Sequence, residues 1–329
     1  MTQQSFVSII TPAFNEAENL PVLYGRLCNV LRTVDTRWEW IVVDDHSTDD
    51  TFEVLKRIIE RDDRVSCFRL SRNFGSHVAI RCGLNNAEGG CAIVMAADLQ
   101  DPPETLPDLL EKWQGGAQVV WATRDRIEGI RKSDLAIGRL FWFVMRRQAG
   151  MRELPTTGAD FFLIDRLVLD YLCQFHETNF NLIMLLSWMG FKQETVKYIK
   201  QARISGRSGW SFEKKLKLAL DSFLSFSYLP IRLMSYAGII AGLLGFVYAV
   251  IVFINFLEGS SIQGWTSLMI VILIFGGIQM LMMGLLGEYL WRTMSEAHRR
   301  PPYLVEAILG KHTHYTENAA PYPKESRST

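Results

Sequence analysis

Two long apolar stretches near the carboxyl end limit what this chain can fold into more than any other feature. Residues 235–257 and 265–287 contain no charged side chain, and each reaches the roughly 20 residues that a helix needs to cross a bilayer. The connection between them, residues 258–264, is too short to hold a domain. A hairpin buried in a soluble core is the alternative, but two such runs in tandem favour a transmembrane helical hairpin.

Positive charge flanks this hairpin on one side only. Arg232 precedes the first stretch, Arg292, Arg299 and Arg300 follow the second, and the connection has no Lys or Arg. Because basic residues concentrate on the cytoplasmic side of membrane proteins, we expect both termini to be cytoplasmic. In the whole chain of 329 residues, 35 basic side chains balance 35 acidic ones, which argues against a nucleic-acid partner.

The amino-terminal part alternates between short apolar runs and segments with helical spacing. The apolar runs, each of strand length, are residues 6–11, 38–44, 65–70, 91–97 and 118–122. The helical segments between the first four runs are residues 17–32, 49–61 and 76–87. This alternation predicts an α/β domain with a parallel sheet and helices on both faces. Nothing at the amino terminus resembles a cleavable signal, because a strand-length run leads directly to Pro12.

Polar and acidic residues follow each of the first four predicted strands, at residues 11–16, 44–49, 71–75 and 98–101. In open parallel sheets, ligands bind beyond the carboxyl ends of the strands, so we expect these loops to share one edge. Each loop alone could be helix-capping chemistry. Together they favour a nucleotide pocket completed by Mg²⁺ or Mn²⁺, because the fourth loop offers oxygen ligands from Asp98, Gln100 and Asp101.

Three motifs carry a resemblance to a known family. The ordered set T-P-A-F-N-E, V-V-D-D-H-S-T-D and A-D-L-Q-D-P-P-E resembles the GT-A glycosyltransferases of family 2, in the polyprenyl-phosphate branch that includes dolichyl-phosphate mannose synthase and bacterial bactoprenol glucosyl transferases. The resemblance covers nearly the whole chain, since the bacterial relatives also carry two carboxyl-terminal spans. It implies a cytosolic GT-A domain with a Rossmann-like, mostly parallel sheet, interfacial amphipathic helices and a two-helix transmembrane hairpin.

The same resemblance implies an activity and a location. The expected reaction is the inverting transfer of a sugar from a nucleotide sugar, with a UDP-sugar favoured over a GDP-sugar, to undecaprenyl phosphate, for use in cell-envelope glycosylation. The expected protein is a homo-oligomer in the bacterial inner membrane. It would divide into a nucleotide-sugar-binding core (1–132), an acceptor-side and juxtamembrane part (133–228), the transmembrane pair (229–292) and a cytoplasmic tail (293–329). The part of the tail after Arg300 is expected to be partly disordered.

Carried over position by position, the resemblance implies a set of site residues. Base and ribose contacts fall on Pro12, Phe14 and Glu16, and the nucleobase contact falls on Asp45. Asp98 and Gln100 would bind the metal that bridges the pyrophosphate. Arg203 and Ser205, with Arg207 beside them, would belong to a loop that closes over the pyrophosphate. A catalytic base or orienting group falls on Asp160, although an Asp near Gly can equally be a turn residue.

One position departs from the family pattern. Many relatives read D-A-D-L-Q, whereas Ala96 occupies the first acidic place here. Mg²⁺ accepts one or two carboxylates together with water and phosphate oxygens, so Asp98 and Gln100 can still form the protein part of such a site. A catalytically silent scaffold that binds nucleotide sugar is one alternative that this departure leaves open. A transferase with another lipid or polysaccharide acceptor is the other.

Basic residues after the fifth predicted strand suit an anionic acceptor at a membrane surface. Arg124, Arg131 and Lys132 are the candidates for holding the acceptor phosphate. Residues 133–151 and 211–229 read as basic amphipathic helices at the interface, although a core helix shows the same pattern. His176 and Glu177 are either site residues or a helix cap.

Overall fold

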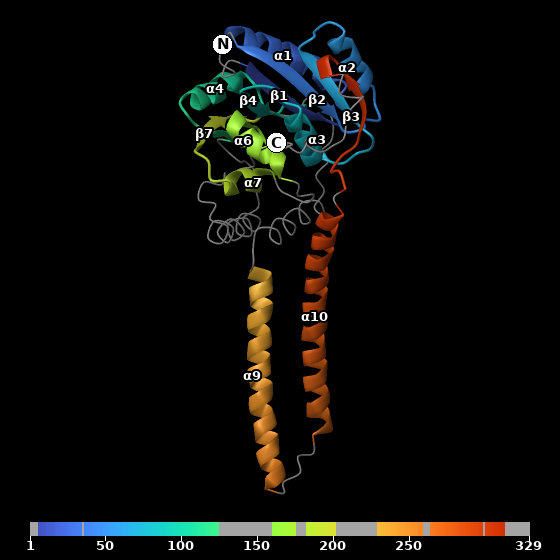
Figure 1. Ribbon diagram of the computed structural model, residues 1–329, viewed down its shortest axis with the longest axis vertical. Coiled ribbons are helices and arrows are strands. Elements are labelled where there is room, and N and C mark those ends of the chain that lie inside the picture. The colour runs from blue at the N-terminus through green and yellow to red at the C-terminus, as the bar shows by residue number, and fades with distance from the viewer. Residues whose placement is uncertain are drawn as a thin grey trace, which may run out of the picture. The chain divides into compact units, whose positions relative to one another are not determined.

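The computed structural model describes residues 6–34, 36–124, 160–175, 182–201, 229–258, 264–298 and 300–312. The chain forms two compact units. One unit combines Met1–Ala219 with Pro301–Thr329, and the other is Leu220–Arg300. In Figure 1 the described residues of the first unit form a mixed α/β domain, and those of the second unit form a pair of long helices.

A single sheet of eight strands organises the first unit, in the order β7-β5-β6-β4-β1-β2-β3-β8. The strands are β1 (Phe6–Ala13), β2 (Arg37–Asp44), β3 (Val65–Leu70), β4 (Cys91–Val94), β5 (Val119–Arg124), β6 (Phe162–Asp165), β7 (Gln193–Tyr198) and β8 (Val305–Leu309). Strands β4, β1, β2 and β3 are mutually parallel, and β7 is parallel to β5. Strand β6 is antiparallel to both neighbours, and β8 is antiparallel to β3.

Helices cover both faces of this sheet, as the sequence predicts. They are α1 (Asn19–Val34), α2 (Thr51–Ile59), α3 (Ser76–Asn85), η2 (Pro103–Thr105), α4 (Leu106–Gln114), α6 (Arg166–Gln174) and α7 (Leu182–Trp188). Helices α1, α2 and α4 share a core with Ile9, Trp40 and Val42, which are fully buried. Helix α3 packs on β1 and β2 and also contacts α6. That approach is close, because a Cβ at Gly83 would collide with Ile10.

The central strands are apolar on both faces, which explains the continuous apolar runs in the sequence. Residues 38–44 are all buried in β2, as expected for a parallel strand between two layers of helices. The predicted strand at residues 91–97 ends earlier, at Val94. The backbone N–H of Met95 still donates to Ile10 O at 3.0 Å, and the chain then turns through Leu99, whose φ is 60°.

The carboxyl-terminal segment differs from its predicted role as a separate, partly disordered tail. Residues 305–309 form β8 at the edge of the sheet, paired with β3. Two residues beyond it, the side chain of Lys311 forms an ion pair with Glu39, a β2 residue that is 1% exposed. Glu39 Oε1 also accepts hydrogen bonds from Ser8 Oγ at 2.6 Å and from Glu88 N at 2.9 Å. The segment after the hairpin therefore belongs to the same compact unit as the sheet.

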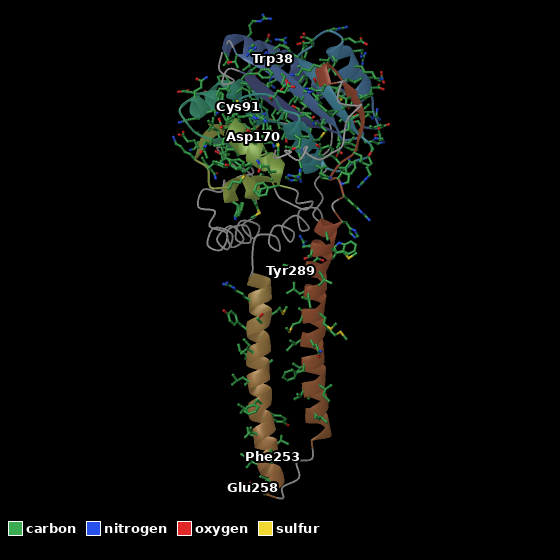
Figure 2. All side chains as sticks on the ribbon, viewed as in Figure 1. Trp38, Cys91, Asp170, Phe253, Glu258 and Tyr289 are labelled. Atoms are coloured by element: carbon green, nitrogen blue, oxygen red, sulfur yellow. The ribbon has the colours of Figure 1, made fainter. Side chains whose placement is uncertain are left out.

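The second unit contains two long helices, α9 (Leu229–Leu257) and α10 (Trp265–Ala297). Both are long and apolar enough to cross a membrane. Figure 2 shows their side chains standing out around each helix, and that of Phe253 is 61% exposed. Exposed apolar surface of this extent is costly in water and favourable in lipid. Helix α10 continues past the predicted boundary at residue 292.

Candidate active site

The carboxyl ends of four neighbouring strands carry residues in the left-handed backbone region. After β1, β2 and β4 these are Asn15 (φ 58°), His46 (φ 60°) and Leu99 (φ 60°), and after β3 it is Gly75 (φ 95°). Non-glycine residues rarely adopt positive φ, and such backbone strain clusters at functional sites. Because the four strands are parallel, the predicted convergence of these loops at one sheet edge is confirmed.

Hydrogen bonds join the first two loops into one surface. The Asn15 N–H donates to Ser47 Oγ at 3.0 Å, and the Glu16 N–H donates to Thr51 Oγ1 at 2.8 Å. Phe14 beside them is 43% exposed although it is large and apolar. An exposed ring beside fixed backbone is suited to stacking against a planar ligand. The base and ribose contacts of Pro12, Phe14 and Glu16 remain a prediction.

Asp45 joins the second loop to the third. It is 3% exposed, and its two carboxylate oxygens accept hydrogen bonds from Phe74 N at 2.7 Å and Gly75 N at 2.8 Å. Burial raises the pKa of Asp45, the two backbone bonds and Arg72 lower it, and neighbouring Asp44 raises it, with a net increase. Asp45 therefore shapes the loop after β3, and its predicted nucleobase contact would use the remaining lone pairs.

The loop after β4 brings oxygen ligands to the same edge. Asp98 is 8% exposed and its Oδ1 accepts a hydrogen bond from Gln100 N at 3.2 Å. Asp101 is 2% exposed and its Oδ1 accepts one from Tyr198 Oη at 2.6 Å. Burial raises the pKa of Asp101; Tyr198 and Lys200 lower it, whereas the nearby carboxylates of Asp98 and Asp160 raise it further. The carboxylates of Asp98 and Asp160 thus both lie close to Asp101 at this edge.

This donor set fits a hard divalent cation, which prefers carboxylate and amide oxygens. No group of three His, Cys, Asp or Glu side chains within the described ranges is arranged to hold a metal by itself. The fit is therefore to an ion that takes Asp98 and Gln100 from the protein and its remaining ligands from substrate oxygens and water, as Mg²⁺ commonly does.

Asp160 lies two residues before β6 and is paired with Arg124, a predicted acceptor residue. The distance from Asp160 Oδ2 to Arg124 Nη2 is 3.8 Å, and the two side chains are 63% and 27% exposed. Asp160 is also close enough to Asp101 to affect its pKa. The structure thus brings Asp98, Asp101, Arg124 and Asp160 together, although they come from three different segments of the chain.

Several predicted site residues lie outside the described residues. They are Arg131, Lys132, His176, Glu177, Arg203, Ser205 and Arg207, together with the two interfacial helices at 133–151 and 211–229.

Two residues at this edge escaped the sequence analysis. Tyr198 ends β7 and bonds to Asp101, as given above. His77 lies in the first turn of α3, and its enclosed Nδ1 has no hydrogen-bond partner within the part of the chain that is described. Burial lowers the pKa of His77, and the charge of Asp160 raises it, with a net decrease. His77 stands two residues after Gly75, the last residue of the S-R-N-F-G loop, and this position was the available signal.

Comparison with known proteins places this geometry in a family. The family described as "Glycosyl transferase family 2" matches residues 8–173, which include the four loops and Asp160. The chain belongs to glycosyl transferase family 2. A second match, "GtrB C-terminal hairpin", covers residues 229–292 and thus both long helices of this family 2 enzyme. The predicted GT-A-like sheet with a membrane hairpin, and the predicted glycosyltransferase class, are confirmed.

Relatives of this family 2 enzyme align over almost their full length. An uncharacterized glycosyltransferase, YkcC, of Bacillus subtilis is 37% identical over 94% of this chain and 96% of its own. A prophage bactoprenol glucosyl transferase homolog of Escherichia coli is 33% identical over 92% of this chain and 99% of its own. Among solved structures, glucosyl-3-phosphoglycerate synthase of Mycobacterium tuberculosis, in complex with Mn²⁺ and UDP-glucose, matches 66% of this chain and 76% of its own at 17% identity, with a TM-score of 0.46.

Proposed function

We propose that this family 2 enzyme transfers a sugar from a nucleotide sugar, with UDP-sugars favoured, to a polyprenyl phosphate such as undecaprenyl phosphate, with inversion at the anomeric carbon. The observation that carries the proposal is that Asp98 and Asp160 both lie close enough to Asp101 to act on its pKa, while Asp160 is paired with Arg124 at 3.8 Å. Asp98 suits a cation-bound pyrophosphate, and Arg124 suits an acceptor phosphate. The bactoprenol glucosyl transferases among its relatives support the same substrate classes.

The reaction is a single displacement. An oxygen of the acceptor phosphate forms a bond to the anomeric carbon while the bond from that carbon to the β-phosphate oxygen breaks, and the electron pair leaves on the nucleoside diphosphate. The acceptor phosphate has a second pKa near 6, so it is largely dianionic at neutral pH and needs little help from a base. Positioning and charge stabilisation therefore dominate the rate.

The residues divide this work between donor and acceptor. Asp98 and Gln100 would hold the divalent cation, whose chemistry is to neutralise charge on the departing diphosphate. Arg124 would bind the acceptor phosphate, together with Arg131 and Lys132. Asp160 would orient Arg124 through their 3.8 Å ion pair or accept a proton from a monoprotonated acceptor.

We also propose an orientation and an assembly. Strand β8 begins at Val305, eight residues after α10 ends at Ala297, so the chain returns to the catalytic sheet directly after the hairpin. This return supports one side of the membrane for the hairpin ends and the catalytic domain, and the arginines that flank the hairpin support the cytoplasmic side. Four glycines of α10 have open space where a Cβ would lie, which supports close contact with another copy in a homo-oligomer. They are Gly276, Gly277, Gly284 and Gly287.

A donor panel tests the proposed reaction. Purified full-length protein would be incubated with radiolabelled UDP- or GDP-sugars, undecaprenyl phosphate and Mg²⁺ or Mn²⁺, and labelled lipid would be extracted and counted. We expect labelled lipid from one donor, no label with Asp98→Asn, and normal labelling with Asp108→Asn, which changes an exposed carboxylate on α4. Absence of labelled lipid from every donor would refute the enzymatic proposal, whereas equal labelling by Asp98→Asn would refute the assigned role of Asp98.

A further inference from the structure

The end of β7 is attached to the predicted metal-binding loop at two points. The Tyr198 hydroxyl donates to Asp101 Oδ1 at 2.6 Å, and the backbone N–H of Gln201 donates to Gln100 O at 3.0 Å. Both side chains of the first bond are buried, with Tyr198 only 6% exposed. A buried hydrogen bond to a carboxylate is among the stronger ones in proteins. The loop that carries Asp98 and Gln100 therefore has a fixed anchor on its carboxyl-terminal side.

The other side of Tyr198 faces the acceptor half of the site. Its ring packs edge-on against Phe161, with centroids 5.8 Å apart and an interplanar angle of 80°. Phe161 is the residue directly after Asp160. Tyr198 is also the register partner of Arg124 in the parallel pair of β5 and β7. Burial and Asp101 raise the pKa of Tyr198 and Arg124 lowers it, with a net increase. Tyr198 thus bonds to the predicted metal loop through Asp101, and it lies beside Arg124 and the residue that follows Asp160.

Ordinary core packing does not account for the hydroxyl of Tyr198. A phenylalanine would keep the edge-on contact with Phe161 and fill the same volume. It would also spare the cost of burying a polar oxygen. The hydroxyl instead satisfies a buried carboxylate, Asp101, which stands one position after Gln100. The pair therefore serves the geometry of the loop rather than the filling of the core.

We propose that Tyr198 is a positioning residue that holds the loop of Asp98 and Gln100 at a fixed distance from Arg124 and Asp160. In this arrangement Asp101 is the acceptor for Tyr198 and is not a metal ligand. The inference rests on the proposed function, since it concerns how the donor and acceptor halves of that site are kept in register. Misplacement of a reacting group by about 1 Å can cost on the order of a hundredfold in rate.

The test removes the hydroxyl alone. Tyr198→Phe would be compared with Tyr171→Phe, a matched change at a tyrosine on α6 that is 48% exposed. Binding of Mn²⁺ to the full-length protein with UDP present would be measured by electron paramagnetic resonance of free Mn²⁺, and turnover would be followed by labelled lipid. We expect Tyr198→Phe to weaken Mn²⁺ binding about tenfold or more, because it leaves the buried Asp101 carboxylate without its donor.

A second variant separates positioning from folding. Asp101→Asn combined with Tyr198→Phe removes the buried charge as well as its donor, so we expect Mn²⁺ binding to recover part of the loss and the two changes to be non-additive. Thermal unfolding followed by circular dichroism would be compared for all variants. If the double variant restores Mn²⁺ binding without a matching gain in unfolding temperature, positioning is supported.

Two outcomes would overturn the inference, and they are distinguishable. If wild type binds Mn²⁺ and Tyr198→Phe binds it equally well, Tyr198 does not position the loop, and the proposed function is unaffected. If wild type binds no Mn²⁺ with or without UDP, the metal part of the proposed function fails, and the role given to Tyr198 fails with it.

Discussion

Replacing Lys311 with methionine should destabilise the folded catalytic domain at neutral pH, although Lys311 is far along the chain from β2, the strand to which its side chain is paired. Its ammonium group pairs with the buried carboxylate of Glu39 in β2 and also contacts Glu88 Oε2 at 3.1 Å. Methionine keeps most of the aliphatic side chain and removes the charge. The change therefore isolates the ion pair that fastens the segment after β8 to the centre of the sheet.

The size of the effect follows from the acidity of Glu39. Burial by itself raises the pKa of Glu39, but the neighbouring donors His312, Lys311, Ser8 and the backbone of Glu88 lower it from 4.5 to about 2. At about 1.4 kcal/mol per pKa unit, this difference contributes about 3 kcal/mol of stability at neutral pH. Lys311 is one of four donors but carries a full charge, so its loss should cost about 1–3 kcal/mol.

The pH dependence gives the sign of the effect. Because the pKa of Glu39 is lower in the folded state than in the unfolded state, its contribution is fully present above pH 4.5 and is lost as the pH falls towards about 2. The difference between wild type and Lys311→Met should therefore be largest at pH 7 and smaller at pH 3.

Urea unfolding of the detergent-solubilised full-length protein, followed by tryptophan fluorescence, measures this difference. Trp40 and Trp121 are fully buried in the sheet and report its unfolding. Lys56→Met is the matched control, because Lys56 pairs with Glu53 on the surface of α2 and such pairs contribute about 0–1 kcal/mol. Equal losses for the two variants at pH 7, or an unchanged Lys311→Met deficit at pH 3, would refute the reasoning.

Three further predictions concern the site. EDTA should abolish turnover and Mn²⁺ should restore it, and full activity in EDTA would contradict a cation at Asp98. Asp45→Asn should raise the donor KM about tenfold, because an amide can accept only one of the two backbone hydrogen bonds that Asp45 now accepts; an unchanged donor KM would show that the loop keeps its shape. Arg124→Lys should raise the acceptor KM more than the donor KM, since lysine cannot bind phosphate bidentately, and equal changes in both would contradict acceptor binding.

The strand pattern of the amino-terminal half could be predicted because parallel strands are buried on both faces and read as continuous apolar runs. The same rule fails for β7, where buried Val196 and Tyr198 alternate with exposed side chains at the sheet edge. It also fails for β8, whose pairing with β3 joins residues far apart in sequence. Local patterns contain no information about such distant partners.

The placement of the candidate site's residues was predictable where one loop supplies them and unpredictable where packing does. The motif around Asp98 and Gln100 stands in one short segment, so its chemistry can be read directly. Its tie to Tyr198 depends on β7 lying beside β5 in the folded sheet. Asp101 shows the same limit. From the sequence it is only a neighbour of the predicted metal ligands, and only the structure shows that it accepts a hydrogen bond from Tyr198.

Strand β8 has a consequence for the order in which this protein is made. The ribosome must synthesise both apolar helices before residues 305–309 exist, so β3 has an unpaired edge while the hairpin enters the membrane. Unpaired edges recruit strands from other chains. Membrane insertion and completion of the catalytic sheet are thus successive stages of a single biogenesis, and a fragment cut before the hairpin would carry a permanently unfinished sheet.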